Sequence, residues 1–368
     1  MRILQVVGCM NMGGLETFVM NVFRSIDRKK VQFDFLYITD EHCFYDDEIE
    51  KLGGRIFRIS GRYKNLKKHC NELNAFIKDN MDIDAVHIHA VSAFCLLDAM
   101  IIKRAGINNI IIHSHASLAP HKFLNNILKQ FIPIYAKTMI ACSDKAAKWL
   151  FPYHCKRNVV ILPNGIDVSK YIYRLDIATE VRDELGLTNK FVIGHVGRMT
   201  EVKNHLFLLH IFSVIKKRNS DAELVLAGDG PLRDKLIGEA KSLGILESVH
   251  FLGVRSDVER LLQSFDAFVF PSLREGLPVS VVEAQAAGLH CFLSDTITRE
   301  VKLTDLVEFI SLGSEAEYWA YEIEKRCYAM IKHKDVTDEI RKYNFDIKKT
   351  ADELYLLYSE KGNEGNGI

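Results

Sequence analysis

Paired cysteines, long apolar runs and an excess of either charge are all missing from this 368-residue sequence. The eight cysteines are scattered and form no Cys-x-x-Cys pair, so we expect reduced thiols of a cytoplasmic protein and no structural zinc site. No run of about 18 apolar residues occurs, so no membrane-spanning helix is expected. Lys and Arg number 48, as do Asp and Glu, so the net charge gives no argument for a nucleic-acid partner.

Proline is also scarce, at 7 residues, while 48% of the residues are hydrophobic and 26% are charged. This composition is typical of a globular chain and excludes a disordered one. The length predicts two domains, each large enough for its own core. We interpret the first eight residues, in which Gln5 and Gly8 interrupt a short apolar run, as a buried strand and not as a signal peptide.

Short runs rich in β-branched and aromatic residues alternate with longer segments of helical period. Because these runs are apolar almost throughout and each precedes a helical segment, they predict an α/β fold with parallel sheets covered on both faces. In the first half the expected strands are Ile3–Val7, Phe33–Ile38, Arg55–Ile59, Ala85–His89, Asn109–His113, Thr138–Ala141 and Val159–Leu162. In the second half they are Phe191–Val196, Glu223–Ala227, His250–Leu252, Ala267–Phe270 and Cys291–Leu293.

The pattern restarts after the turn-rich segment 162–167, so we expect two doubly wound domains joined near residues 165–175. Beyond residue 312 the sequence predicts helix to about Glu360 and then a polar tail. Ligands of open α/β sheets bind at the carboxyl ends of the strands. The residues that directly follow each strand are therefore the candidates for a site.

Gly13 and Gly14 follow the first strand and open a helix that carries Glu16. Paired glycines let a ligand approach the backbone, and a helix N-terminus offers free N–H groups to an anion. The spacing is not that of the G-x-G-x-x-G dinucleotide fingerprint. A plain turn is the alternative interpretation.

Two cations follow the first strand of the second half. Gly197 and Arg198 end this strand, and Lys203 lies just before the next helix. Arginine gives planar bidentate hydrogen bonds and lysine adds a point charge, so the pair suits a diphosphate. Two solvated surface cations are the alternative.

Glu275 and Glu283 mark the segment that follows the strand at 267–270. We expect Glu275 to face the ligand from a loop and Glu283 to reach a ligand hydroxyl from the following helix. Pro278 suits the first turn of that helix, and the amides after Gly276 provide a second N-terminus suited to an anion.

A fourth segment, Ala227-Gly228-Asp229-Gly230-Pro231, joins a strand to a helix through two glycines. It either holds a nucleotide base against the backbone or forms an ordinary tight turn. By itself this segment is weak evidence.

Four histidines alternate near the ends of two strands, namely His87, His89, His113 and His115. Residues two apart on a strand share a face, so a metal site is one interpretation. Hydrogen-bonded core or cleft histidines are the favoured interpretation.

Together these segments resemble the retaining, GT-B-fold glycosyltransferases of family 4, which include many capsule, exopolysaccharide and lipopolysaccharide enzymes. In the second half the resemblance is carried by Gly197-Arg198 with Lys203, Ala227–Pro231, Phe251-Leu252-Gly253, the Glu-x7-Glu string Glu275–Glu283, Ala287-Gly288 and Ser294-Asp295. In the first half it is carried by Gly13–Glu16, Asp84–His89 and the helix start at Ser143. His290 stands where the family often has proline, which concerns the stiffness of a loop more than the chemistry.

The resemblance implies two Rossmann-like domains facing across a cleft. An acceptor-binding domain would span residues 1–168, with helix 346–361 packing back on it, and a donor-binding domain would span residues 169–345. The implied reaction is retaining transfer of a hexose or N-acetylhexosamine from a nucleotide diphosphate sugar, UDP-sugar first, to a lipid-linked or saccharide acceptor. No cofactor is implied in this step of cell-surface polysaccharide biosynthesis.

The same resemblance assigns roles to residues. The catalytic residues it implies are His115, Arg198, Lys203 and Glu275. The donor-binding residues it implies are Gly14, Gly197, Arg198, Lys203, Gly230, Pro231, Phe251, Gly276, Leu277, Val279 and Glu283. On the acceptor side it implies Gly13, Glu16 and His89.

No metal ligand is implied, because Arg198 and Lys203 would balance the charge of the diphosphate. The string Asp82-Ile83-Asp84 spells the D-x-D of metal-dependent transferases with another fold, but it precedes a strand and we interpret it as a coincidence. Two other functions remain open, since fold does not fix function. One is a nucleotide-sugar epimerase or phosphorylase of the same fold, and the other is a non-catalytic partner subunit that binds the sugar nucleotide.

The zero net charge hides two halves of opposite sign. Residues 1–170 hold 23 Lys and Arg against 16 Asp and Glu, and residues 171–368 hold 25 against 32. The basic half includes the runs 64–69 and 121–137, and the second of these contains apolar residues at helical spacing. We expect either peripheral contact with an anionic membrane at the inner face of the plasma membrane or a helix packed on its own domain.

Overall fold

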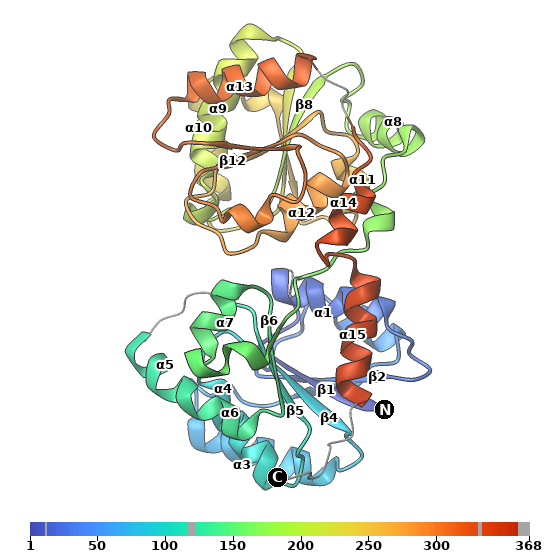
Figure 1. The fold of residues 1–368 in the computed structure, drawn as a ribbon. Helices are drawn as coiled ribbons and strands as arrows, with labels where there is room; N and C mark the ends of the chain where they lie inside the picture. The colour runs from blue at the N-terminus through green and yellow to red at the C-terminus, as the bar shows by residue number, and fades with distance from the viewer. Residues whose placement is uncertain (12, 117–121, 330–332, 360–368) are drawn as a thin grey trace. The chain divides into compact units, whose positions relative to one another are not determined.

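The computed structural model describes residues 1–11, 13–116, 122–329 and 333–359. The chain divides into two units, drawn in Figure 1. Unit 1 comprises Met1–Gly165 and Asn344–Ile368, and unit 2 comprises Ile166–Tyr343. The chain thus passes from unit 1 to unit 2 between Gly165 and Ile166, whereas the sequence predicts the boundary after residue 168.

Unit 1 contains, among its described residues, a seven-stranded parallel sheet in the order β3-β2-β1-β4-β5-β6-β7. Its strands are β1 (Arg2–Val7), β2 (Gln32–Tyr37), β3 (Ile56–Arg58), β4 (Ala85–Ala90), β5 (Ile110–Ser114), β6 (Thr138–Ala141) and β7 (Val159–Ile161). Its α-helices are α1 (Gly14–Ser25), α2 (Asp46–Lys51), α3 (Leu66–Asp79), α4 (Cys95–Arg104), α5 (Lys122–Leu128), α6 (Ile132–Tyr135), α7 (Asp144–Leu150) and α15 (Ile347–Ser359). Every strand predicted in the first half is present, with ends that differ by no more than one residue.

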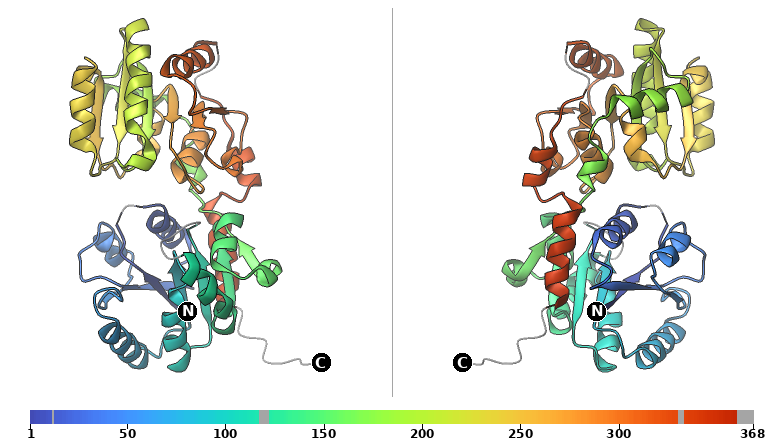
Figure 2. Two further views of the ribbon diagram at one scale, coloured as in Figure 1. Left: turned by 90° about the vertical axis from the view of Figure 1, so that its left-hand side faces the viewer. Right: turned by 90° about the vertical axis from the view of Figure 1, so that its right-hand side faces the viewer.

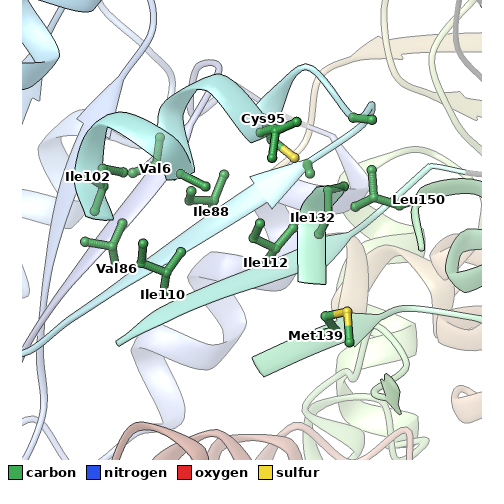
Figure 3. Packing of buried hydrophobic residues seen from close by; sticks show 14 of the residues in the cluster. Val6, Val86, Ile88, Cys95, Ile102, Ile110, Ile112, Ile132, Met139 and Leu150 are labelled. Carbon is green, nitrogen blue, oxygen red and sulfur yellow. The ribbon is translucent and has the colours of Figure 1, made fainter. Parts of the chain in front are cut away.

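One face of this sheet is apolar along its whole described length. Successive strand residues point to opposite faces, so one face collects alternate side chains such as Val86, Ile88 and Ile110. Figure 3 shows these side chains lying beside Ile102 of α4. Helices α3, α4, α6 and α7 contribute to this core.

The opposite face is covered by α1 and α15, which contact each other. Helix α15 buries one stripe of residues three or four positions apart, formed by Ile347, Ala351, Leu354 and Tyr358. Figure 2 shows this helix, drawn in red, alongside the blue and cyan elements of unit 1. Residues of α15, near the end of the chain, therefore share one hydrophobic core with residues of β1 and α1, near its start. Towards the carboxyl ends of the central strands, this face also carries buried polar residues, namely Gln5, His87, His89 and His113.

Unit 2 contains, in the part of it that the structure describes, a six-stranded parallel sheet in the order β10-β9-β8-β11-β12-β13. The strands are β8 (Phe191–Val196), β9 (Ala222–Ala227), β10 (Val249–Gly253), β11 (Ala267–Phe270), β12 (Cys291–Ser294) and β13 (Val307–Ile310). The α-helices are α8 (Leu175–Glu184), α9 (His205–Arg218), α10 (Arg233–Ser242), α11 (Val258–Leu262), α12 (Val279–Ala286), α13 (Ala316–Ala329) and α14 (Thr337–Lys342). The prediction of two doubly wound α/β domains is confirmed.

Two elements of unit 2 are absent from the prediction. Helix α8 lies between the expected join near residues 165–175 and the strand at 191–196, where no helix is predicted from the sequence. It buries just Ala178 and Val181, so its apolar period is weak. Strand β13 is four residues long and lies at the edge of the sheet, where an apolar run is not required.

Candidate active site

The carboxyl edge of the unit 2 sheet is built from segments tied together through the backbone. The bonds are Gly197 N–H to Ala227 O (2.9 Å), Met199 N–H to Asp229 O (3.0 Å), Gly228 N–H to Gly253 O (2.7 Å) and Leu273 N–H to Val202 O (2.8 Å). They join the loops after β8, β9 and β11 and the end of β10. The side chains that these loops carry are therefore held in fixed relative positions.

Two glycines allow the loops to approach so closely. Gly228 has a φ of 132°, and a Cβ there would lie 2.2 Å from the carbonyl oxygen of Gly197. A Cβ on Gly230 would lie 2.5 Å from the carbonyl oxygen of Met199. Only glycine fits at either position. The segment that the sequence alone left as weak evidence is thus part of the framework of this edge.

Lys203 and Glu275 form an ion pair at this edge, with 2.8 Å between Nζ and Oε1. Both side chains are largely buried, with 19% and 16% exposed. The Lys203 ammonium also lies 4.5 Å from the ring centre of Phe270. The amide of Asn204 donates to the carbonyl oxygen of Pro271 (3.1 Å), which ties the two loops together.

Arg198 differs from Lys203 in being exposed. Within the described part of the chain its guanidinium has neither a hydrogen bond nor an ion pair. Half-buried Gly197 precedes it, and a Cβ there would lie 3.3 Å from Lys203 Cε. A free guanidinium and a partly buried ammonium thus lie on one loop, an arrangement that can hold an anion.

Helix α12 begins at Val279, after the half-buried residues Gly276 and Leu277 and the N-cap residue Pro278. The first N–H groups of a helix have no partner within it, so this N-terminus can receive an anion. Glu283 lies one turn further along and is buried, and its Oε1 accepts a hydrogen bond from the Tyr171 hydroxyl (2.8 Å). Burial raises the pKa of Glu283 to about 7.

The edge residues predicted to flank a nucleotide base lie on neighbouring segments. Gly230 and exposed Pro231 lie between β9 and α10, and half-buried Phe251 lies on β10, which pairs with β9. All predicted donor-binding residues of unit 2 therefore lie at the carboxyl edge of one sheet or in the helices that start there.

In unit 1, Gly13 caps α1 and Gly14 is its first residue. A Cβ on Gly13 would lie 2.3 Å from Glu16 Oε2, so Glu16 folds back over the start of its own helix. Burial raises the pKa of this carboxyl above its ordinary value. Gly14 is exposed, so its backbone is accessible.

The four histidines also gather at the carboxyl edge of unit 1. In the sheet register His89 lies beside His113, and Gln5 of β1 lies beside His87. His89 bonds through Nε2 to Gln5 Oε1 (2.8 Å) and through Nδ1 to His115 Nε2 (2.9 Å). Gln5 and His89 thereby fix the ring of His115.

These imidazoles are neutral at pH 7. Burial lowers the pKa of His87 and of His115 to about 3, and it lowers the pKa of His89 and His113 well below the usual range. The Tyr358 hydroxyl bonds to His87 Nδ1 (2.7 Å), so α15 also contributes to this cluster.

One ring nitrogen from each of His87, His89 and His113 lies within 4.8 Å of the others, close enough for three imidazoles to share a metal ion. The rings are stacked, however, with centroids 4.2 Å apart for His87 and His89 and 5.4 Å apart for His87 and His113. Stacked rings direct their lone pairs along nearly parallel planes, whereas a tetrahedral ion needs converging lone pairs. Both ring nitrogens of His89 and Nδ1 of His87 have hydrogen-bond partners, whereas His87 Nε2 and both ring nitrogens of His113 have none among the described residues. The interpretation as hydrogen-bonded histidines therefore holds for His89 and not for His113.

Comparison with known proteins matches both units to glycosyltransferases. The family model described as Glycosyltransferase Family 4 matches residues 12–170, and the model described as Glycosyl transferases group 1 matches residues 177–307. The chain is 37% identical over 373 residues to EpsF of Bacillus subtilis (strain 168), named as a glycosyltransferase, over 97% of this chain and 96% of that protein. The chain belongs to glycosyltransferase family 4.

A second relative of this family 4 glycosyltransferase is CapH of Staphylococcus aureus, a capsular polysaccharide biosynthesis glycosyltransferase. It is 26% identical over 380 residues, which covers 98% of this chain and 99% of CapH. The predicted resemblance to capsule and exopolysaccharide enzymes is confirmed.

Solved structures share the GT-B fold of this glycosyltransferase. Anabaena Alr3699/HepE in complex with UDP and glucose has a TM-score of 0.79 at 18% identity, over 98% of this chain and 100% of that one. WaaG, a glycosyltransferase of lipopolysaccharide biosynthesis, has a TM-score of 0.70 at 14% identity, over 98% and 100%. In the described part of this glycosyltransferase, no helix has the length and apolar character needed to cross a bilayer.

Sequence reasoning missed three residues that shape the two edges of this glycosyltransferase. Tyr171 bonds to Glu283, Gln5 bonds to His89, and Asn204 ties the loops around Lys203. Gln5 carried a usable signal, since an amide in the middle of an apolar central strand needs a partner. No sequence signal pointed to Tyr171, because its partner Glu283 lies far along the sequence.

Proposed function

We propose that this glycosyltransferase is a retaining hexosyltransferase that uses a nucleotide diphosphate sugar, with UDP-sugar as the first candidate. The acceptor would be a lipid-linked or other saccharide in cell-surface polysaccharide biosynthesis. The observation that carries the proposal is the exposed guanidinium of Arg198, free among the described residues, on the same loop as the partly buried ammonium of Lys203, at an edge that two glycines allow to form. The names of two relatives support the donor and acceptor classes.

One of these relatives is the UDP-Gal:alpha-D-GlcNAc-diphosphoundecaprenol alpha-1,3-galactosyltransferase of Escherichia coli, 28% identical over 244 residues and 63% of this chain. The other is the N,N'-diacetylbacillosaminyl-diphospho-undecaprenol alpha-1,3-N-acetylgalactosaminyltransferase of Campylobacter jejuni, 31% identical over 182 residues and 47% of this chain. Both act on acceptors linked to a diphosphate lipid, and both transfer a hexose or an N-acetylhexosamine. We propose the same class of acceptor for this chain because of its similarity to these two relatives.

Arg198 and Lys203 would act on the leaving group. Departure of a nucleoside diphosphate builds negative charge on its phosphate, so fixed cations stabilise the transition state more than the ground state. The amides of Gly276, Leu277 and Val279 at the start of α12 would hold the sugar and the phosphate together with Glu275. Because two protein cations balance the diphosphate charge, we propose that the reaction needs no metal ion.

The remaining donor contacts would belong to the nucleoside. Glu283 would bind the ribose, and Gly230, Pro231 and Phe251 would flank the base. Glu283 is suited to this role because a carboxylate can accept hydrogen bonds from ribose hydroxyls.

Within unit 1, Gly13, Glu16 and His89 would form the acceptor side, and His115 would contribute to catalysis. A pKa of about 3 makes His115 a weak base. We therefore propose that the leaving phosphate, and not this imidazole, helps to deprotonate the acceptor hydroxyl as it attacks from the same face.

The exposed face of α5 and α6, with the segment 129–131 between them, would contact the membrane. It carries five exposed apolar residues, namely Phe123, Leu124, Ile127, Phe131 and Ile134. Buried Asn125 fixes the other side of α5, because its side chain bonds to Ala93 N–H (2.7 Å) and to Trp149 O (3.0 Å). The helix is thus both packed on its own domain and open to a partner.

The basic runs contribute less to this face than their sequence suggests. His121, the first residue of the second run, lies outside the described residues. His69, the last residue of the first run, is buried against Asp98 and adds no surface charge.

The purified protein incubated with a panel of UDP- and GDP-sugars tests the function, because a bound donor raises thermal stability by mass action. The donor that stabilises the protein is then supplied with a diphosphate-lipid saccharide, and the product and its anomeric configuration are analysed by mass spectrometry and NMR. Transfer with retention supports the proposal. Conversion of the donor without any acceptor would instead indicate an epimerase, and binding without transfer to any acceptor would indicate a partner subunit.

A further inference from the structure

Tyr171 and Glu283 form a buried hydrogen bond that sequence reasoning did not anticipate. The Tyr171 hydroxyl donates to Glu283 Oε1 at 2.8 Å, and the two residues are only 7% and 8% exposed. Tyr171 follows the short 3-10 helix η3 (Val168–Lys170), while Glu283 lies on α12. The bond therefore joins the first segment of unit 2 to the helix that carries the Glu-x7-Glu string.

Gln263 fixes the backbone on both sides of Tyr171. Its Oε1 accepts from the N–H of Arg174 (2.8 Å), and its Nε2 donates to the carbonyl oxygen of Lys170 (3.5 Å). Gln263 is itself 1% exposed. Its Nε2 also donates to the carbonyl oxygen of Glu259 (3.1 Å), so each polar atom of this buried amide is hydrogen-bonded. The segment 170–174 therefore holds the tyrosine ring in one position.

The hydroxyl occupies only one of the two carboxylate oxygens. Among the described residues, Glu283 Oε2 has no hydrogen-bond partner. We propose that Tyr171 is a positioning residue that orients Glu283 so that Oε2 accepts a hydrogen bond from a ribose hydroxyl of the nucleotide. This inference rests on the proposed function, in which Glu283 binds the ribose.

The same bond favours the ionised carboxyl group. Burial and, to a smaller extent, the nearby charge of Glu259 on α11 raise the pKa of Glu283, the bond from Tyr171 lowers it, and the net pKa is about 7. Asp167 is the other charged group facing the tyrosine. Without the hydroxyl, burial and Glu259 act unopposed and the carboxyl group is protonated over a wider range of pH. A protonated carboxyl accepts the ribose hydroxyl less well.

The test is the Tyr171→Phe variant of the full chain, with nucleotide affinity measured by calorimetry between pH 6 and pH 9. UDP and GDP are both tried with the wild type, and the tighter ligand is used throughout. We expect about tenfold weaker binding at pH 7, since hydrogen bonds to charged groups contribute at this level. We also expect much of the loss to be recovered near pH 9, where the carboxyl group ionises in both proteins.

Tyr173→Phe is the matched control, because Tyr173 is two residues away and stacks on His333 without touching Glu283. We expect it to bind like the wild type. A wild type that binds neither nucleotide would contradict the proposed function itself. A wild type that binds, with a Tyr171→Phe variant of equal affinity at every pH, would overturn this inference alone.

A second variant keeps the test decisive if Tyr171→Phe does not fold. Glu283→Gln keeps a side-chain oxygen for the tyrosine but removes the titrating group. We expect its affinity to be independent of pH between 6 and 9, whereas that of the wild type falls below about pH 7. A pH profile shared by both proteins would refute the role assigned to the ionised carboxylate.

Discussion

The ammonium of Lys203 lies 2.8 Å from the carboxylate of Glu275, so these two opposite charges partly neutralise each other. A diphosphate that binds Lys203 would have to share the ammonium with Glu275 or displace the carboxylate. Arg198 carries no such competitor among the described residues. The two cations are therefore not equivalent, and Arg198 is the one free to meet an incoming anion.

Replacing either cation by alanine is expected to slow the reaction. Arg198→Ala and Lys203→Ala should each cost about 2–4 kcal/mol in transition-state stabilisation, by analogy with the loss of an oxyanion donor. The measurement is kcat/KM for the identified donor, with Lys235→Ala, an exposed lysine on α10, as the control. A loss below threefold for both site variants would refute their assignment.

The affinity of Lys203 for the donor should also depend on Glu275. Glu275→Gln removes the competing charge but keeps a polar side chain of the same size. We expect tighter binding of the nucleoside diphosphate alone, because the freed ammonium no longer loses a partner on binding, and slower transfer, because the sugar loses a contact. Calorimetry and turnover measured on one preparation check the two effects. Weaker diphosphate binding would show that the ion pair helps the site instead of competing with it.

We propose metal independence on the basis of the same two cations. We expect full transfer activity in a chelator such as EDTA, since Arg198 and Lys203 would supply the positive charge for which other enzymes use Mg²⁺. Activity is measured on chelator-treated protein before and after addition of Mn²⁺. Loss of activity in chelator and recovery with Mn²⁺ would contradict the prediction.

The histidine cluster of unit 1 predicts a loss of stability in acid. In the folded protein the pKa values of His87 and His115 are about 3, against 6.5 for a free imidazole. Below pH 6.5 the unfolded chain therefore binds more protons, so the stability contributed by each group is complete above that pH and falls towards pH 3. At pH 5 the loss is about 2 kcal/mol for each such group.

His113→Phe tests this dependence, since His113 is fully buried and its pKa is lowered in the same way. The difference in the free energy of unfolding between pH 7.5 and pH 5, measured in urea, should shrink relative to the wild type. His154→Gln, at an exposed position, is the control and should leave the difference unchanged. His69 works in the opposite direction, because Asp98 raises its pKa, so the comparison between variants is more informative than the wild-type curve. An unchanged pH dependence in His113→Phe would contradict the burial argument.

The fold could be predicted from the sequence because its buried parallel strands are apolar on both faces, a pattern that few other structures produce. The sequence also placed Arg198, Lys203, Glu275 and Glu283 at one edge, since each lies in the loop or in the helix that follows a strand. The sequence did not predict the Tyr171–Glu283 hydrogen bond or the Lys203–Glu275 ion pair, because both contacts depend on how loops fold back over the sheet. Helix α8 was missed for a related reason, since a helix that buries only two residues leaves almost no periodic signal.

Membrane contact is expected to depend on the apolar face of α5 and α6. The double variant Phe123→Ser with Ile127→Ser removes two exposed apolar side chains without touching Asn125, which holds the helix to the domain. Each buried side chain of this size contributes about 1.5–3 kcal/mol, so even partial insertion predicts at least a tenfold loss of liposome binding. The measurement is sedimentation with vesicles containing anionic lipid. The control is Leu175→Ser, which changes an exposed apolar residue on α8 of unit 2. Binding that is insensitive both to anionic lipid and to the double variant would mean that this face does not meet a membrane.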